Sequence, residues 1–214
     1  MERLFNLQQN LYYSSGGLAE ALLVIDKRTM LTPTKLRVLY EHAITVKVLA
    51  LDGDVVDAGV WEGGSTYALA SALPDKTIHA FDSWDGLPTP GVEDLVGLDE
   101  QPMGRGWGKC QPPTDFLSPF GDRIIFHQGW FKDTLSDVEG TEFCLVHIDC
   151  DQYQSVKECL EFFYPNMVKN GIIVIDDYGF ELTPGATIAT DEFFVDKMNS
   201  ISYSLHAGLN IRIL

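Results

Sequence analysis

The sequence is poor in basic residues, poor in cysteine and free of long apolar runs. Its 15 lysines and arginines stand against 31 aspartates and glutamates, which gives a formal net charge of −16. This negative charge disfavours binding to nucleic-acid phosphates or to anionic lipid. No apolar run approaches the roughly 18 residues that a membrane-spanning helix requires. We therefore expect neither a nucleic-acid partner nor a membrane partner.

The four cysteines form no metal-binding or redox motif. Cys110, Cys144, Cys150 and Cys159 contain no C-x-x-C pair, and two of them fall within one apolar run. The first ten residues carry charges and amides in place of the apolar stretch of a secretory signal. We therefore expect reduced cysteines, no zinc site built from them, and a cytoplasmic protein.

Short apolar, β-branched segments alternate with helix-forming segments along the chain. Helices are expected at residues 2–27, 32–50, 64–73, 131–137, 152–167 and 186–199, and strands at residues 54–60, 77–82, 123–127, 142–149, 171–176, 201–206 and 209–213. This alternation favours an α/β protein whose mainly parallel, doubly wound sheet lies under helices on both faces. We expect a single domain over residues 1–214, with N-terminal helices in residues 1–50.

The segment of residues 83–115 fits neither pattern. It is rich in glycine and proline and has no clear periodicity. Connections of this length in a compact domain usually carry a function or are mobile. We interpret the segment as a lid over the binding site that helps to select the acceptor.

Polar residues stand where several expected strands end, namely Asp57, Asp82, His127, Asp149 and Asp176. Ligands of parallel α/β sheets bind at the carboxyl ends of the strands, so these positions indicate a binding site. We interpret the histidine as a local hydrogen-bonding side chain and the aspartates as candidates for ligand binding.

Two of these strand ends fit a ligand that contains a nucleoside. The segment from Asp57 to Ser65 reads Asp-Ala-Gly-Val-Trp-Glu-Gly-Gly-Ser, and its glycines let the backbone approach a ligand closely. Its spacing differs from the G-x-G-x-x-G of nicotinamide-binding domains. Asp82 follows at the next strand end, where an acidic residue accepts the hydroxyls of an adenosine ribose. A tight turn and a helix cap are the ordinary alternatives for these two features.

Four carboxylates are expected at the ends of two neighbouring strands. Asp149 and Asp151 follow one strand, and Asp176 and Asp177 follow the next. Such like charges raise each other's pKa, and a bound cation relieves the repulsion. Oxygen ligands favour Mg²⁺, with Mn²⁺ or Ca²⁺ as alternatives, over zinc. In the alternative interpretation the carboxylates extend into solvent as loop caps.

Four segments resemble motifs of the macrocin O-methyltransferase family, whose members methylate sugar hydroxyls of macrolides and related natural products. The first two are Phe-Asp-Ser-Trp-Asp-Gly-Leu-Pro at residues 81–88 and Gly-Trp-Phe-Lys-Asp-Thr-Leu at residues 129–135. The other two are His-Ile-Asp-Cys-Asp-Gln-Tyr at residues 147–153 and Gly-Ile-Ile-Val-Ile-Asp-Asp-Tyr-Gly at residues 171–179. The resemblance implies a seven-stranded class I methyltransferase sheet whose last strand is antiparallel, and S-adenosylmethionine as the methyl donor.

The resemblance also implies roles for individual residues. The residues expected to contact S-adenosylmethionine are Asp57, Gly59, Gly63, Gly64, Ser65, Asp82, Ser83, Gln128, Gly129, Trp130 and Asp149. Within this set, the turn at residues 59–64 would hold the methionine part, Asp82 the ribose, and residues 128–130 would border the adenine. Asp149, Asp176 and Asp177 match the family's metal ligands, and Asp151 matches its proposed general base.

We therefore expect a metal-assisted O-methyltransferase that acts on a hydroxyl of a small molecule, a sugar or a related diol. A catechol-type O-methyltransferase is one alternative. A glycosyltransferase that uses Asp149-Cys150-Asp151 as a D-x-D motif is another, but it leaves Asp176, Asp177 and the glycine turn without a role. A catalytically silent cofactor-binding module is a third. The sequence does not identify the acceptor, and it leaves a homo-oligomer open.

Overall fold

The structure is a computed structural model that describes residues 17–99, 103–197, 200–204 and 208–213. The strands are β1 (Asp54–Ala58), β2 (Ile78–Asp82), β3 (Ile124–Gln128), β4 (Phe143–Ile148), β5 (Met167–Ile175), β6 (Ser200–Ser204) and β7 (Gly208–Arg212). The longer helices are α2 (Pro33–Leu49), α3 (Gly64–Ala72), α6 (Tyr153–Phe163) and α7 (Pro184–Phe194). The shorter elements are α4 (Thr114–Leu117), α5 (Phe131–Thr134), and the 3₁₀ turns η1 (Glu93–Leu95), η2 (Ser118–Arg123), η3 (Leu135–Val138) and η4 (Tyr164–Asn166).

The strands form one sheet in the order β3-β2-β1-β4-β5-β7-β6. Strands β1 to β5 pair in parallel, whereas β7 is antiparallel to both β5 and β6. The predicted α/β class, the mainly parallel sheet and the antiparallel last strand are confirmed. The chain first builds the sheet outward from β1 through β2 to β3 and then returns to place β4 on the other side of β1. A ligand site is expected at such a reversal, outside the carboxyl ends of the strands.

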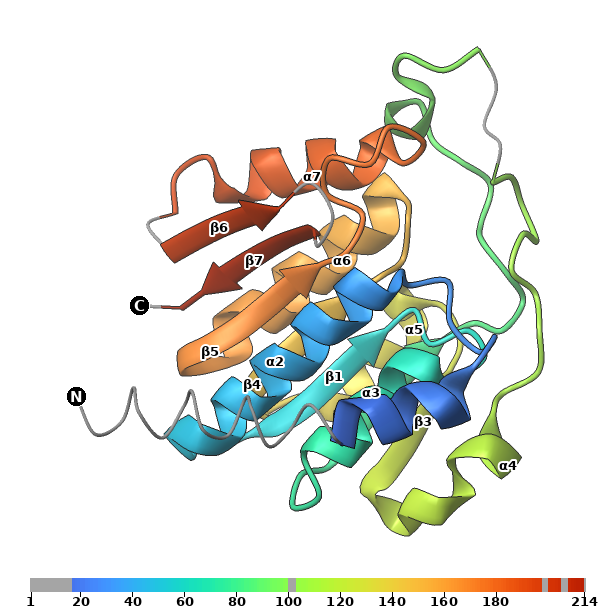
Figure 1. Ribbon diagram of the computed structural model, residues 1–214. Coiled ribbons are helices and arrows are strands. Elements are labelled where there is room, and N and C mark those ends of the chain that lie inside the picture. Colours follow the sequence, from blue (N-terminus) through green and yellow to red (C-terminus); the bar gives the residue numbers. More distant parts are fainter. Residues whose placement is uncertain (1–16, 100–102, 198–199, 205–207, 214) are drawn as a thin grey trace.

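The sheet separates two hydrophobic clusters, because alternate residues of a strand point to opposite faces. Val55 and Ile172 pack in one cluster with residues of α2 and α3, whereas Val56 and Ile173 pack in the other with residues of α6 and α7. Figure 1 shows α2 in front of the sheet and α6 behind it. Helices therefore cover both faces, as the apolar strands predicted.

Helix α2 begins as the sequence predicts. Thr32 is the N-cap, and its hydroxyl accepts a hydrogen bond from the Lys35 amide at 3.2 Å. Pro33 follows at the first helical position, where a missing amide hydrogen costs nothing. The predicted helix at residues 2–27 is helical from residue 17 to residue 25, and its earlier part lies outside the described residues. No helix in the described part of the chain is long and apolar enough to cross a membrane.

Two predicted boundaries between residues 152 and 176 are wrong. Helix α6 ends at Phe163 rather than near residue 167, because the next turn, η4, contains Pro165 and continues with 3₁₀ geometry. Strand β5 begins at Met167 rather than at Gly171, and its pairing with β4 is irregular over these extra residues. The polar residues Lys169 and Asn170 interrupt the apolar pattern there, which concealed the start of the strand.

The connection from β2 to α4 contains little regular structure, but the protein anchors it at two places. Leu87 exchanges backbone hydrogen bonds with Gly106 and Trp107 across the connection, at 2.8 and 2.9 Å. The buried carboxylate of Asp94 accepts hydrogen bonds from the amides of Gly91 at 2.8 Å and of Tyr153, at the start of α6, at 2.7 Å. The connection is therefore joined to itself through Leu87 and to α6 through Asp94.

Candidate active site

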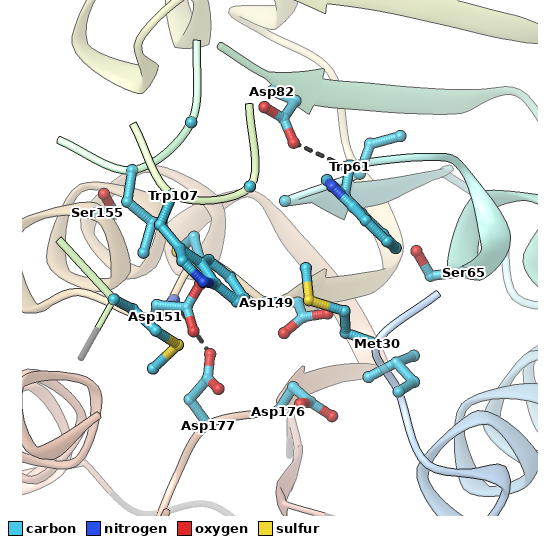
Figure 2. A pocket seen from close by; sticks show the side chains of 18 of the residues that line it. Met30, Trp61, Ser65, Asp82, Trp107, Asp149, Asp151, Ser155, Asp176 and Asp177 are labelled. Carbon is cyan, nitrogen blue, oxygen red and sulfur yellow. Dashed lines mark hydrogen bonds between the residues drawn. The ribbon is translucent and has the colours of Figure 1, made fainter. Parts of the chain in front are cut away.

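A cavity of about 550 Å³ opens at the carboxyl ends of the parallel strands. Its size is in the usual range for small-molecule sites. Ten of the predicted site residues line it: Gly59, Ser65, Asp82, Ser83, Gly129, Trp130, Asp149, Asp151, Asp176 and Asp177. Figure 2 shows the aspartates projecting toward the same space from separate strand ends. Four other predicted contacts, Asp57, Gly63, Gly64 and Gln128, are not among its lining residues.

Asp57 supports the cavity wall from behind. Its carboxylate is fully buried and accepts hydrogen bonds from the hydroxyls of Ser65 at 2.8 Å and Thr66 at 2.5 Å. Its other oxygen lies 2.8 Å from Nδ1 of His147 on β4. This carboxylate therefore fixes the β1 turn against α3 and β4.

Gly59 allows the β1 turn to lie against the end of β4. Its φ is +100°, which L side chains rarely adopt, and a Cβ here would lie 1.8 Å from the carbonyl oxygen of Asp149. A side chain would therefore force the two strand ends apart. The glycine keeps backbone at the cavity wall, as expected for close approach to a ligand.

Asp82 is held by the two turns beside it. One oxygen accepts a hydrogen bond from the Trp61 amide at 2.8 Å, and the other accepts one from the Trp84 amide at 2.7 Å. Both tryptophans have positive φ, +48° and +52°, so strained backbone aims these amides at the carboxylate. Burial raises the pKa of Asp82, while the backbone amides oppose this rise. The Val60 amide also bonds to this carboxylate, which keeps acceptor capacity for a further donor.

The end of β3 contributes Gly129 and the partly exposed ring of Trp130. His127 does not enter the cavity lining, since its Nδ1 lies 3.2 Å from Asp137 and its Nε2 lies 3.0 Å from His79. The interpretation of His127 as a local hydrogen-bonding residue is confirmed.

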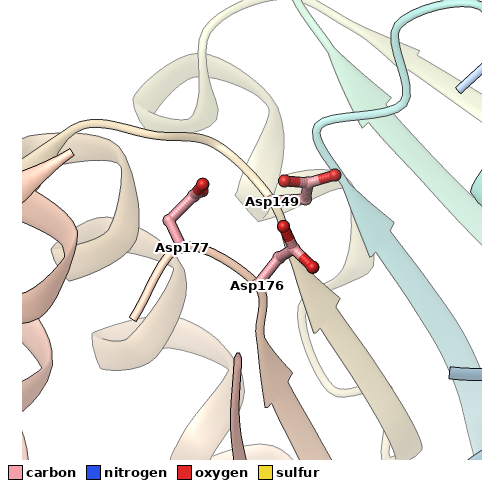
Figure 3. Close-up of side chains that lie close together, drawn as sticks. All are labelled: Asp149, Asp176 and Asp177. Carbon is pink, nitrogen blue, oxygen red and sulfur yellow. The ribbon is translucent and has the colours of Figure 1, made fainter. Parts of the chain in front are cut away.

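The carboxylates at the ends of β4 and β5 form the most concentrated group in the cavity. Asp149, Asp176 and Asp177 each offer an oxygen, and these oxygens lie within 4.8 Å of one another. Figure 3 shows the three side chains around one small space. The Asp151 amide donates a hydrogen bond to Asp177 at 3.0 Å, which keeps the fourth carboxylate beside the group. An all-carboxylate donor set of this size fits a hard divalent cation such as Mg²⁺.

Burial and mutual repulsion raise the pKa values of several carboxylates in the cluster. Burial, and then repulsion from Asp176 and Asp177, raises the pKa of Asp149 well above its usual value. Burial, followed by repulsion from Asp151 and Asp176, does the same to the pKa of Asp177. The pKa of Asp151 rises to about 6, mainly through burial and the charge of Asp176. A positive charge placed among these groups would offset their mutual repulsion and lower their pKa values.

Such a positive charge comes from a residue that the sequence analysis missed. The ammonium of Lys35, in the first turn of α2, lies 2.5 Å from Oδ2 of Asp176 and donates to the Asp176 carbonyl oxygen at 3.0 Å. Burial lowers the pKa of Lys35, but the attraction of Asp176, Asp177 and Asp149 outweighs it and raises the pKa. Nothing in the local sequence of α2 indicates this contact, since the partners are 141 residues apart.

Apolar side chains line the remaining wall. Met30, Trp107 and Phe180 line the cavity and are each more than a third exposed. In Figure 2, Trp107 and Met30 face the same space as Asp149 and Asp151. Exposed apolar surface next to polar groups is typical of a pocket that binds an organic molecule.

Comparisons with known proteins agree with this geometry. Residues 26–201 match the sequence model of the macrocin O-methyltransferase (TylF) family. A 4'-O-methyltransferase of 8-demethyl-8-(2,3-dimethoxy-alpha-L-rhamnosyl)-tetracenomycin-C from Streptomyces olivaceus is 28% identical over 149 residues, which are 64% of this chain and 57% of the relative. Demethyldecarbamoylnovobiocin O-methyltransferase from Streptomyces niveus is 28% identical over 160 residues, or 66% of this chain and 58% of the relative. The chain thus spans less than 60% of the length of either relative.

The fold also matches solved structures. The O-methyltransferase NovP superimposes with a TM-score of 0.73 at 24% identity, over 87% of this chain and 82% of NovP. The calicheamicin methyltransferase CalS11 superimposes with a TM-score of 0.71 at 18% identity, over 96% of this chain and 91% of CalS11. At these identities the likeness shows the fold alone, which is the Rossmann-like α/β fold of methyltransferases.

The raised pKa of Asp151 predicts how stability depends on pH. With a folded pKa of about 6 and an unfolded pKa of about 3.9, the folded protein binds more protons between these values. The stability that Asp151 contributes is complete below pH 4 and is lost as the pH rises through 6. In excess chelator, the free energy of unfolding of the wild-type protein should therefore fall by about 1–3 kcal/mol between pH 4 and pH 7 because of Asp151. Asp151→Asn should lack this part of the fall, and urea denaturation measures both proteins.

The exposed Asp75 provides the matched control, since Asp75→Asn removes the same charge. Asp75→Asn should follow the wild-type curve. A wild-type pH dependence in Asp151→Asn as well would contradict the assignment.

Proposed function

Because this chain belongs to the macrocin O-methyltransferase family, we propose that it transfers a methyl group from S-adenosylmethionine to a hydroxyl of a sugar or related diol. The observation that carries the proposal is the group of four carboxylates that faces the cavity at the ends of β4 and β5. The name of the Streptomyces olivaceus relative contains a rhamnosyl group, which supports a glycoside as the acceptor class. The acceptor would be a small molecule.

S-adenosylmethionine would lie across the ends of β1, β2 and β3. Asp82 lines the cavity as a fixed acceptor, so it would accept hydrogen bonds from the ribose hydroxyls. The β1 turn at Gly59 and Ser65 would hold the methionine part, and Trp130 would border the adenine. Asp57 lies behind this wall, so we assign it the support of the turn instead of direct contact.

The cation would be Mg²⁺ or Mn²⁺, held by Asp149, Asp176 and Asp177. Their oxygens lie close enough together for one ion. Burial and then mutual repulsion raise the pKa values of Asp149 and Asp177, and a bound ion would remove that repulsion. When bound, such a cation supplies Lewis acidity at the acceptor hydroxyl.

Asp151 would act as the general base. It lies beside the cluster, and a pKa of about 6 keeps it largely ionised at neutral pH while leaving it more basic than an ordinary aspartate. The acceptor oxygen would attack the sulfonium methyl while Asp151 takes the hydroxyl proton. The electron pair of the broken carbon–sulfur bond would stay on sulfur as S-adenosylhomocysteine, so the transfer would need no covalent enzyme intermediate. The site aligns donor and acceptor for this displacement.

Residues 83–115 would act as a lid with one moving part. The hydrogen bonds of Leu87 join the two arms of this segment and those of Asp94 join it to α6, so closure would involve mainly the stretch between Asp94 and Gly106, of which residues 100–102 lie outside the described residues. Trp107 lies at the foot of this part and lines the cavity, where its ring would contact the acceptor. Closure would exclude water during methyl transfer.

We expect turnover to require the divalent cation. Excess chelator should abolish methyl transfer to a diol acceptor, and Mg²⁺ should restore it. Asp149→Ala should remain inactive even at high Mg²⁺, because loss of a Lewis acid costs several kcal/mol of transition-state stabilisation. Measurement of S-adenosylhomocysteine formation tests this, and full activity in excess chelator would refute it.

Asp151→Asn is the matched variant within the same cluster. It should keep cation and cofactor binding, measured by calorimetry, but slow turnover by roughly 10²–10⁴-fold, the usual contribution of a general base. Loss of cation binding in this variant would instead make Asp151 a ligand.

We expect Asp82 to determine cofactor affinity. Asp82→Ala should weaken S-adenosylhomocysteine binding by about 1.5–3 kcal/mol, because charge-assisted hydrogen bonds to the ribose are lost. Calorimetric titration measures the change, with Asp85→Ala as the control, since Asp85 is exposed and pairs only with exposed Lys109 among the described contacts. Equal affinities for the two variants would place the adenosine elsewhere.

The lid hypothesis predicts a localised change in hydrogen exchange. Residues 96–105 should become protected when S-adenosylhomocysteine and acceptor bind, whereas the anchored amides of Leu87 and Gly106 should already be protected in the free protein. Peptide-level exchange with and without ligands measures both. Unchanged exchange at 96–105, together with normal kinetics of an Arg105→Ala/Trp107→Ala double variant, would exclude a lid.

A further inference from the structure

Lys35 stands out because the chemistry described above gives it no role. It belongs to α2, which comes before every strand of the sheet in the sequence. Its ammonium nevertheless contacts both the side chain and the backbone carbonyl of Asp176. The Lys35 side chain is 19% exposed and the Asp176 side chain is 7% exposed, so water screens this ion pair only weakly. The ammonium also lies 5.9 Å from the centre of the Phe180 ring. Several contacts therefore define its position.

The charges of the cavity make this ammonium significant. Five carboxylates line the cavity, and Lys35 is the sole lysine or arginine among the described lining residues. The ammonium attracts Asp176, Asp177 and Asp149, which are the three carboxylates proposed to hold the cation. Without another cation, it is the main compensation for their mutual repulsion.

An ammonium fixed at this place weakens the binding of a second cation to the cluster. Asp176 has two oxygens, and Oδ2 is already occupied by Lys35. A divalent ion bound to the cluster would share Asp176 with the ammonium and experience its positive charge at a distance of a few ångströms. This like-charge repulsion is worth far more in a half-buried site than in water.

We propose that Lys35 is a resident counter-ion of the carboxylate cluster, which holds Asp176 in position and weakens the binding of the divalent cation so that the ion stays exchangeable. This inference rests on the proposed function, because it presumes that the cluster binds a divalent ion. Lys35 is thus a positioning residue that acts through Asp176 and sets the affinity of the site.

The inference differs from a purely structural role. If Lys35 only tied α2 to β5, its loss would loosen the site and leave the affinity for cations unchanged or weaker. If it is a counter-ion, its loss should tighten cation binding even though an ion pair has been removed. The direction of the change in affinity distinguishes the two.

The experiment is a calorimetric titration of residues 1–214 with Mn²⁺ at a fixed pH of about 7.5, without S-adenosylmethionine or acceptor. Lys35→Met keeps the apolar stem and removes the charge, so it should bind Mn²⁺ about 10- to 100-fold more tightly than wild type. Lys35→Arg keeps the charge and should stay within about threefold of wild type. Saturating Mn²⁺ should also raise the Tm of Lys35→Met by more than it raises that of wild type.

Lys47→Met is the matched control. Lys47 is an exposed residue of the same helix, and twelve residues of helix place it about 18 Å farther along the axis. The substitution changes the net charge equally but should leave Mn²⁺ affinity at the wild-type level, since solvent ions screen charges at this distance. A tighter site in Lys47→Met would show that only net charge matters and would overturn the inference.

Two further outcomes separate the inference from the proposed function. If wild type binds Mn²⁺ but folded Lys35→Met binds it equally or more weakly, the counter-ion role is wrong and the cation site stands. If wild type and Asp149→Ala both fail to bind Mn²⁺, the cation site is wrong and the inference fails with it. Circular dichroism checks folding, and Lys35→Gln, with the same expected tightening, replaces Lys35→Met should that variant not fold.

Discussion

Repulsion among buried carboxylates is the constraint on which the rest of the site depends. Ile148 of β4 pairs with Ile175 of β5, so the parallel register places the next residues, Asp149 and Asp176, side by side. β4 is buried along its whole length, which leaves these strand ends little freedom to separate. The apolar core therefore holds together charges that would move apart in a flexible loop. The ammonium of Lys35 offsets this repulsion, and the proposed divalent ion would offset it further.

The neighbouring strand ends are equally fixed, but by hydrogen bonds. Buried Asp57 joins β1, α3 and β4, and Asp82 is held by two backbone amides in turns with positive φ. One half of the cavity is thus a rigid polar frame that suits a cofactor. The other half combines the carboxylates with exposed apolar rings, among them Trp107, which suits an acceptor with both hydroxyls and an apolar body. Division of the cavity in this way would suit the proposed transfer between two bound molecules.

Sequence patterns predicted what depends on local periodicity. Alternation of apolar strands and helices gave the class of fold, and polar residues at strand ends identified the carboxylates that the parallel sheet brings together. Contacts between distant elements were beyond this reasoning. Lys35 reaches Asp176 only because α2 packs over the sheet, and Asp94 anchors the long connection only because α6 begins beside it. Asp57 is predicted from the sequence as a cofactor contact, and its inward hydrogen bonds to α3 and His147 depend on contacts that the local pattern does not contain.

Diffraction from crystals grown with Mn²⁺ and S-adenosylhomocysteine tests the central claim most directly. The anomalous signal of manganese identifies the ion and its ligands without reference to activity. The account predicts one peak bonded to oxygens of Asp149, Asp176 and Asp177, with Asp151 nearby but not bonded, and with the ribose of the cofactor on Asp82. A cluster without a manganese peak at saturating Mn²⁺, or a peak ligated by Asp151 in place of one of the three, would contradict it.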